Sequence, residues 1–178
     1  MRLAVFASGT GSNLEAIAKK LPVDLVFSDN PNSRALTLLP EVPKVTFRPR
    51  DFPSRNEYEE ALVQMVRDYR IGLVALAGYM RVVGDALLCA LPGRIVNLHP
   101  SLLPAFPGRN AIQRAFESGV RETGVTVHFV DEGVDTGPII AQEKVMMQKS
   151  LSELESAIHE CEHRLYPEVI ERILKGEE

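Results

Sequence analysis

The sequence predicts an α/β fold, with a doubly wound, mostly parallel sheet of about seven strands and helices on both faces. Short apolar runs of strand length alternate with helical patterns along the chain, and this alternation is typical of a parallel sheet. The last two runs are joined only by residues 131–137, too short a segment for a crossover between parallel strands. One of these two runs is therefore expected to be antiparallel, which makes the sheet mixed.

The composition predicts one soluble domain, residues 1–178, with 45% apolar and 25% charged residues. A net charge of −4 argues against bulk binding of nucleic acid. Two cysteines, Cys89 and Cys161, stand in no metal-like spacing and favour a reducing compartment. The apolar start, residues 1–7, is too short for a signal peptide or a membrane span. We therefore expect a cytoplasmic protein that does not bind membranes.

Seven runs predict strands, at residues 3–7, 24–28, 45–47, 71–77, 94–98, 123–130 and 138–146. Residues 71–77 form the most apolar run and are expected at the centre of the sheet. Helical patterns cover residues 14–21, 55–69, 110–118 and 151–174. Ser54-x-x-Glu57 and Ser150-x-x-Glu153 are capping boxes that open two of these helices. Gly119 and Gly124 are expected to be turn residues.

The stretch from Asn97 to Pro104 is expected to be a rigid loop at the end of a strand, because proline restricts the backbone at and before its own position. If the strand geometry persists, Asn97 and His99 point to the same face. A single histidine near a strand end is more often structural than catalytic. Its odds improve because ligands of such sheets bind at the carboxyl ends of the strands. The loops at Gly9, Gly78, Asn97 and Asp135 are all expected to leave such ends.

The first glycine turn leaves two alternatives open. Gly9-Thr10-Gly11 could indicate a dinucleotide-binding turn, with Asp29 placed at the end of the second strand as a ribose-binding acid. The third glycine of that pattern is replaced by Leu14, which makes a nicotinamide cofactor the weaker hypothesis. A single phosphate held by Gly11, Ser12 and Asn13 fits better, since the free amides of a helix start face an anion.

Residues 159–163 match the zinc-protease pattern H-E-x-x-H, with His159 and His163 four apart on the last helix. No third ligand is evident near them. The same helix carries an apolar stripe and is expected to dock on the core; the stripe is Leu151, Leu154, Ile158, Cys161, Leu165 and Val169. We therefore expect no metal, and a partly exposed structural role for most of this run.

Taken together, six segments resemble the folate-dependent formyltransferases. They are Ser8–Leu14, Ala77–Arg81, Asn97–Pro104, Gly124–Val130, Asp135–Pro138 and Glu162–Pro167. The match runs in order along nearly the whole chain. The Asn-x-His-Pro-Ser-Leu-Leu-Pro and Asp-x-Gly-Pro pieces are specific to folate-dependent formyl transfer. The glycine turn with Ser12-Asn13 narrows the resemblance towards the members that act on glycinamide ribonucleotide in purine synthesis.

The resemblance implies a Rossmann-like formyltransferase fold, and a function in which the formyl group of 10-formyltetrahydrofolate passes to the amine of glycinamide ribonucleotide. Asn97, His99 and Asp135 would be catalytic. The ribonucleotide would contact Gly11, Ser12, Asn13 and Glu162. The folate would contact Arg55, Met80, Arg81, Val82, Val83, Asn97, Asp131, Glu132, Gly133, Val134 and Asp135. Partners are expected to be small molecules, with a homodimer as a possible assembly.

Three rivals share part of this pattern. A formyltetrahydrofolate hydrolase would use the same three catalytic residues with water as acceptor, but that family carries an extra N-terminal regulatory domain. Methionyl-tRNA formyltransferases carry a C-terminal RNA-binding domain. We expect neither domain here. A non-catalytic folate- or phosphate-binding protein would need none of Asn97, His99 and Asp135.

Overall fold

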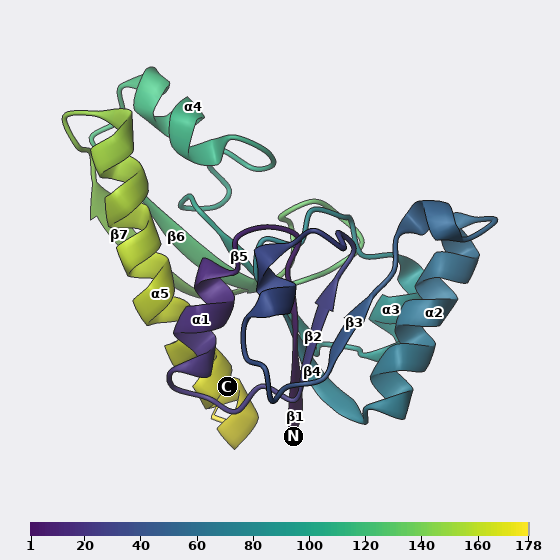
Figure 1. The fold of residues 1–178 in the computed structure, drawn as a ribbon. Helices are drawn as coiled ribbons and strands as arrows, with labels where there is room; N and C mark the ends of the chain where they lie inside the picture. Colours follow the sequence, from purple (N-terminus) through teal and green to yellow (C-terminus); the bar gives the residue numbers. More distant parts are fainter. Residues whose placement is uncertain (178) are drawn as a thin grey trace. The chain divides into compact units, whose positions relative to one another are not determined.

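The computed structural model describes residues 1–177, and the chain forms two compact units, Met1–Val96 and Asn97–Glu178 (Figure 1). Seven strands form one mixed sheet in the order β3-β2-β1-β4-β5-β6-β7. The expected α/β fold with about seven strands is confirmed, and β4 stands fourth of the seven, as its apolar sequence predicted. No helix within residues 1–177 has the length and apolar character that a bilayer crossing requires.

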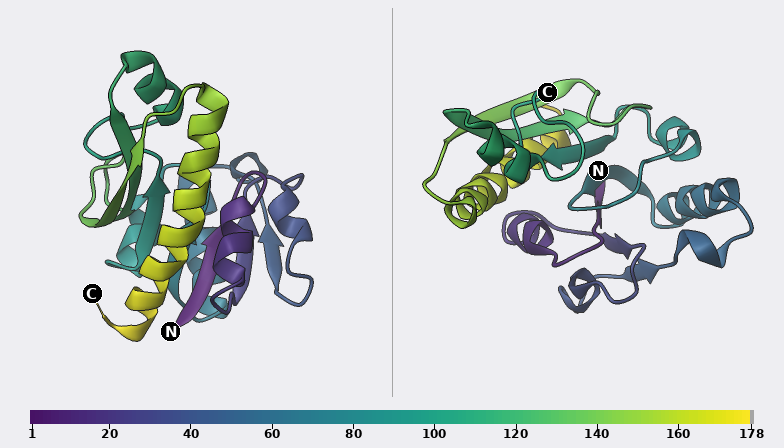
Figure 2. Two further views of the ribbon diagram at one scale, coloured as in Figure 1. Left: turned by 90° about the vertical axis from the view of Figure 1, so that its left-hand side faces the viewer. Right: turned by 90° about the horizontal axis from the view of Figure 1, so that it is seen from above.

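The first unit is a parallel sheet with helices on both faces. Its strands are β1 (Arg2–Phe6), β2 (Leu25–Ser28), β3 (Lys44–Thr46) and β4 (Ile71–Leu76), and all their pairings are parallel. Helix α1 (Ser12–Ala18) covers one face, and α2 (Arg55–Asp68) with α3 (Asp85–Ala90) covers the other (Figures 1 and 2). Two short 3₁₀ turns, η1 (Arg34–Thr37) and η2 (Pro49–Asp51), lie between β2 and α2.

The second unit is built on an antiparallel pair, β6 (Glu122–Phe129) and β7 (Ile139–Met146), which confirms the predicted reversal. Strand β5 (Ile95–His99) crosses from the first unit into the second. The long helix α5 (Leu151–Lys175) packs along β6 and β7, and the short helix α4 (Ala111–Ser118) contacts α5 (Figure 2, left). Their core joins Val125 and Val145 to Leu154, Ile158 and Cys161 of the predicted stripe.

Both predicted helix starts are confirmed. The Ser54 and Ser150 hydroxyls accept hydrogen bonds from the backbone amides of Glu57 and Glu153. In return, the Glu153 carboxylate accepts a hydrogen bond from the backbone amide of Ser150. The reciprocal bond is different at α2, where Glu57 accepts from the Ser54 hydroxyl instead.

Two sequence expectations need correction. Helix α3 was not predicted, because it is only six residues long and its first position, Gly84, offers no side-chain cap. Gly119 ends α4 in the left-handed region at φ 73, as a turn glycine does, but Gly124 lies inside β6. A Cβ at Gly124 would collide with the Glu143 carbonyl and the Leu102 side chain, so close packing is the reason for glycine there.

Candidate active site

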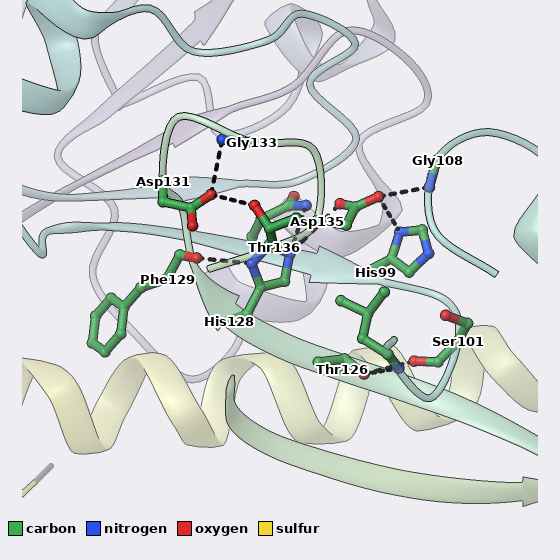
Figure 3. Close-up of polar contacts among 12 residues, drawn as sticks. His99, Ser101, Gly108, Thr126, His128, Phe129, Asp131, Gly133, Asp135 and Thr136 are labelled. Carbon is green, nitrogen blue, oxygen red and sulfur yellow. Dashed lines mark hydrogen bonds and ion pairs between the residues drawn. The ribbon is translucent and has the colours of Figure 1, made fainter. Parts of the chain in front are cut away.

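A histidine and an aspartate face each other at the end of β5 in the second unit. His99 is 5% exposed, and its Nδ1 lies 3.4 Å from Oδ2 of Asp135 (Figure 3). The other ring nitrogen, Nε2, lies 2.8 Å from the carbonyl oxygen of Phe106. The structure therefore brings together two of the three side chains that the sequence singled out for catalysis.

The partners of His99 fix the orientation of its ring. The Phe106 carbonyl can only accept a hydrogen bond, so Nε2 of His99 carries a proton. The other ring nitrogen, Nδ1, faces the carboxylate of Asp135. The ring is therefore held between a backbone carbonyl and a negative charge.

Asp135 is held by the backbone as well as by histidines. Its Oδ2 accepts the Gly108 amide at 2.8 Å, and its Oδ1 lies 3.7 Å from Nε2 of His128. The pKa of Asp135 is lowered from 3.8, first through His128 and then through the Gly108 amide and His99, while burial opposes the change. The residue has φ 55, a left-handed conformation that aspartate tolerates better than most residues.

His128 is a candidate site residue that the sequence prediction did not include. Its Nδ1 lies 2.8 Å from the Phe129 carbonyl, which can only accept, so this nitrogen carries a proton. Its Nε2 lies 3.3 Å from the Asn97 amide nitrogen and 3.7 Å from Oδ1 of Asp135. His128 therefore contacts two of the predicted catalytic residues, Asn97 and Asp135. The available signal was its place on the same predicted strand face as Thr126, just ahead of the Asp135 loop.

The backbone of the loop after β5 forms hydrogen bonds with the side chains of His99 and Asp135. Phe106, Gly108 and Asn110 all have positive φ, and this turns the Phe106 carbonyl to His99 and the Gly108 amide to Asp135. Arg114 of α4 stabilises the loop by donating to the carbonyls of Pro107 and Arg109. The helix that follows the loop thus holds the loop in place through the Arg114 side chain.

Thr126 anchors the first half of the same loop to β6. Its hydroxyl donates to the Ser101 carbonyl at 2.6 Å and accepts the Leu103 amide at 3.1 Å (Figure 3). A third bond comes from the Gln142 side-chain amide at 2.9 Å. The Thr126 hydroxyl thus makes all three of its hydrogen bonds within the protein, so the role of this buried residue is structural.

The predicted phosphate cradle lies in the first unit, between β1 and α1. Gly11 has φ 78, and a Cβ on it would come 2.8 Å from Leu38 and 3.1 Å from the Ala35 backbone. Only glycine fits this position. Three successive carbonyls of the turn each accept from a side chain that follows β2: Ser8 from Asn30 at 3.2 Å, Gly9 from Ser33 at 2.8 Å, and Thr10 from Arg34 at 3.1 Å.

The predicted folate loop, residues 80–83, follows β4 in the same unit. Met80 and Val82 are exposed, at 61% and 50%, whereas Val83 is buried. Arg55, which the resemblance placed near the folate, donates to the Val82 carbonyl at 3.3 Å. The structure therefore brings Arg55 to this loop, with two apolar side chains left facing outward.

Glu162 is buried in α5, at 5% exposure, and its Oε2 lies 3.0 Å from Nδ1 of the half-exposed His159. This hydrogen bond is the main reason that the pKa of His159 is raised. Nε2 of His163 is buried without a hydrogen-bond partner in the described chain. Within residues 1–177 no three His, Cys, Asp or Glu side chains form a metal-binding group.

Chelators are expected to leave the activity intact, because within residues 1–177 no third ligand joins the two histidines of the H-E-x-x-H run. Glu162→Gln is expected to raise the Michaelis constant for glycinamide ribonucleotide, if Glu162 contacts the amine end of that substrate as the sequence resemblance implies. Metal analysis and steady-state kinetics of the two proteins check both statements. Stoichiometric zinc whose removal abolishes activity would contradict the first.

This arrangement, an imidazole beside a carboxylate with an amide two residues away, suits transfer of an acyl group to a nucleophile. The family model described as formyl transferase matches residues 1–170. The chain belongs to the formyl transferase family.

The relatives narrow the comparison further. The chain is 44% identical to the phosphoribosylglycinamide formyltransferase of Bacillus subtilis, over 97% of this chain and 94% of that protein. It is 39% identical to part of the trifunctional purine biosynthetic protein adenosine-3 of Drosophila melanogaster, over 98% of this chain and 14% of that longer protein. The crystal structure of phosphoribosylglycinamide formyltransferase from Streptococcus pneumoniae matches with a TM-score of 0.94 and 46% identity, over 97% of this chain and 98% of that one.

Proposed function

We propose that the protein transfers the formyl group of 10-formyltetrahydrofolate to the amine of glycinamide ribonucleotide, giving formylglycinamide ribonucleotide and tetrahydrofolate in purine biosynthesis. The observation that carries this proposal is the His99–Asp135 pair, with the amide of Asn97 held by His128. The near full-length similarity to phosphoribosylglycinamide formyltransferases supports the same reaction.

The reaction needs a neutral nucleophile and a charged acid in one place. An α-amino group has a pKa of roughly 8, so about a tenth of the substrate amine is neutral at pH 7. The neutral amine attacks the formyl carbon, and negative charge develops on the formyl oxygen. The departing folate nitrogen must then receive a proton.

His99 and Asn97 can supply both needs. The imidazolium of His99 would stabilise the developing oxyanion and donate the proton. Its Nε2 proton is given to Phe106 in this structure, so direct donation requires that this bond be exchanged for one to the substrate. The Asn97 amide has two N–H donors, and one contact to His128 leaves the second for the oxyanion. Asp135 would keep His99 charged.

The binding assignments follow the same proposal. The ribonucleotide phosphate is assigned to Gly11, Ser12 and Asn13, directly after three carbonyls that each accept a hydrogen bond from a side chain following β2. The glycinamide end is assigned to Glu162. The folate is assigned to Arg55, to residues 80–83 and to residues 131–135, where Met80, Val82 and Val134 expose apolar surface.

We also infer a single formyltransferase domain, since the family model runs through both compact units. Two free cysteines, one exposed and one buried, support a cytoplasmic location. A homodimer is retained as part of the proposal, to be checked by light scattering.

Formyl release is expected to depend on the ribonucleotide, because the phosphate cradle and Glu162 are assigned to an amine acceptor. Purified protein with 10-formyltetrahydrofolate should form tetrahydrofolate quickly only when glycinamide ribonucleotide is added. Product analysis by liquid chromatography checks this. Formate and tetrahydrofolate appearing at full rate without the ribonucleotide would establish a hydrolase instead.

A further inference from the structure

Asp29 is the residue that the sequence offered as a ribose-binding acid, and the structure gives its carboxylate a different set of partners. It is 6% exposed and lies directly after β2. Its Oδ1 accepts the Ser8 hydroxyl at 2.5 Å, and its Oδ2 accepts Nε of Arg81 at 2.7 Å. Both oxygens are therefore engaged by the protein.

These two partners belong to different loops. Ser8 opens the turn that ends in the phosphate cradle, and Arg81 belongs to the predicted folate loop after β4. The carboxylate of Asp29 thus joins two segments that lie 73 positions apart in the sequence, Ser8 and Arg81. No other charge is needed at this junction, since one guanidinium balances one carboxylate.

Ser8 completes the connection. Its hydroxyl gives its only proton to Asp29 and accepts the Met80 amide at 3.1 Å. Its own amide donates to the Gly78 carbonyl at 3.2 Å. The path from the Met80 amide through the Ser8 hydroxyl to Asp29 is a chain of hydrogen bonds with a consistent direction, which a carboxylate at its end strengthens.

We propose that Asp29 is a positioning residue for both substrates, which sets the phosphate cradle through Ser8 and the folate loop through Arg81 and the Met80 amide. This inference rests on the proposed function, because that function assigns the two loops to the two substrates. Asp29 itself touches neither substrate.

The surrounding contacts provide matched controls. Ser33 donates to the Gly9 carbonyl and belongs to the cradle side only. Glu59 of α2, 5% exposed, accepts the Gly84 amide at 3.1 Å and supports only the segment that follows the folate loop. Ser33 lies behind the cradle and Glu59 beside the end of the folate loop, so each controls for the loss of one buried polar contact near one loop only.

The test compares Asp29→Asn, Ser33→Ala and Glu59→Gln with the unaltered protein. Calorimetry gives the dissociation constants of glycinamide ribonucleotide and tetrahydrofolate, and thermal unfolding gives the stability. Asp29→Asn is expected to weaken both ligands roughly tenfold, the effect of one lost charge-assisted hydrogen bond. Ser33→Ala should weaken only the ribonucleotide, and Glu59→Gln only tetrahydrofolate. The turnover number should change less than the dissociation constants.

The inference is overturned if Asp29→Asn weakens only one ligand, or lowers the unfolding temperature while both constants stay the same. If Asp29→Asn does not fold, Ser8→Ala carries the same test, because it cuts the link between Asp29 and the Met80 amide. An unaltered protein that binds neither ligand contradicts the proposed function itself. An unaltered protein that binds both, with variants outside the expected pattern, contradicts only the role of Asp29.

Discussion

Replacing His99 with alanine is expected to lower turnover by about 10²–10⁴, the usual contribution of a positioned acid or base. The variant loses the imidazole ring that is held between the Phe106 carbonyl and Asp135, and it leaves the aspartate without that partner. Single-turnover kinetics with both substrates measures the chemical step directly. Binding of the ribonucleotide should change little, because its phosphate is assigned to Gly11, Ser12 and Asn13.

Asn97→Ala serves as the comparison for that result. It removes one oxyanion donor, which is worth on the order of 3 kcal/mol of transition-state stabilisation. It also frees Nε2 of His128 from its contact with the amide. Near-normal turnover in both the His99 and the Asn97 variants would return the end of β5 to a purely structural role.

Asp135→Asn is expected to lower turnover steeply, by about 10² or more, while both substrates bind nearly as before. Asparagine keeps the shape of the side chain and tolerates the left-handed backbone at φ 55, so the loop is retained. It loses the negative charge that faces Nδ1 of His99. NMR of the free protein near neutral pH should therefore show a smaller fraction of His99 in the imidazolium form.

The same substitution has a pH signature in stability. The pKa of Asp135 is lowered in the folded protein, first by His128, so the ionised carboxylate stabilises the fold above its ordinary pKa of 3.8. That contribution to stability is lost as the pH falls below 3.8 and through the lower pKa that Asp135 has in the folded protein. Acid unfolding of Asp135→Asn should lack this component.

For the NMR experiment, an unchanged His99 charge state in Asp135→Asn would show that the two residues are not coupled, whatever happens to the rate.

The regular part of the fold could be predicted because it is encoded locally. Each of the seven strands coincides with an apolar run to within a few residues, and the two serine caps mark the starts of α2 and α5. Helix α3 could not be predicted in this way. The amide of Gly84 at its start donates to Glu59, which lies 25 positions earlier and is brought there only by the packing of α2 against α3.

The candidate site also contains residues that the sequence pattern reveals and residues that only the fold brings into place. Asn97, His99 and Asp135 stand in sequence patterns, and the structure places their side chains in one cluster with His128. The Phe106 carbonyl carries no sequence signal, because any residue has a carbonyl and its direction here depends on φ 51 at a phenylalanine. His128 meets Asn97 through strand pairing and Asp135 through the fold of a loop, neither of which the spacing of residues reveals.

The loop that carries Asp135 is fastened at several points along its length. Asp131 accepts both the Gly133 amide and the Thr136 hydroxyl, and the Phe129 amide donates to the Pro138 carbonyl. Gly137 lies so close to the Phe129 carbonyl that a Cβ would collide with it. These contacts all lie between residues 129 and 138, so the loop holds its own shape, and the Gly108 amide links it to the loop after β5 through Asp135. The carboxylate proposed to be catalytic is therefore carried on a loop whose local shape is defined by its own hydrogen bonds before any substrate binds.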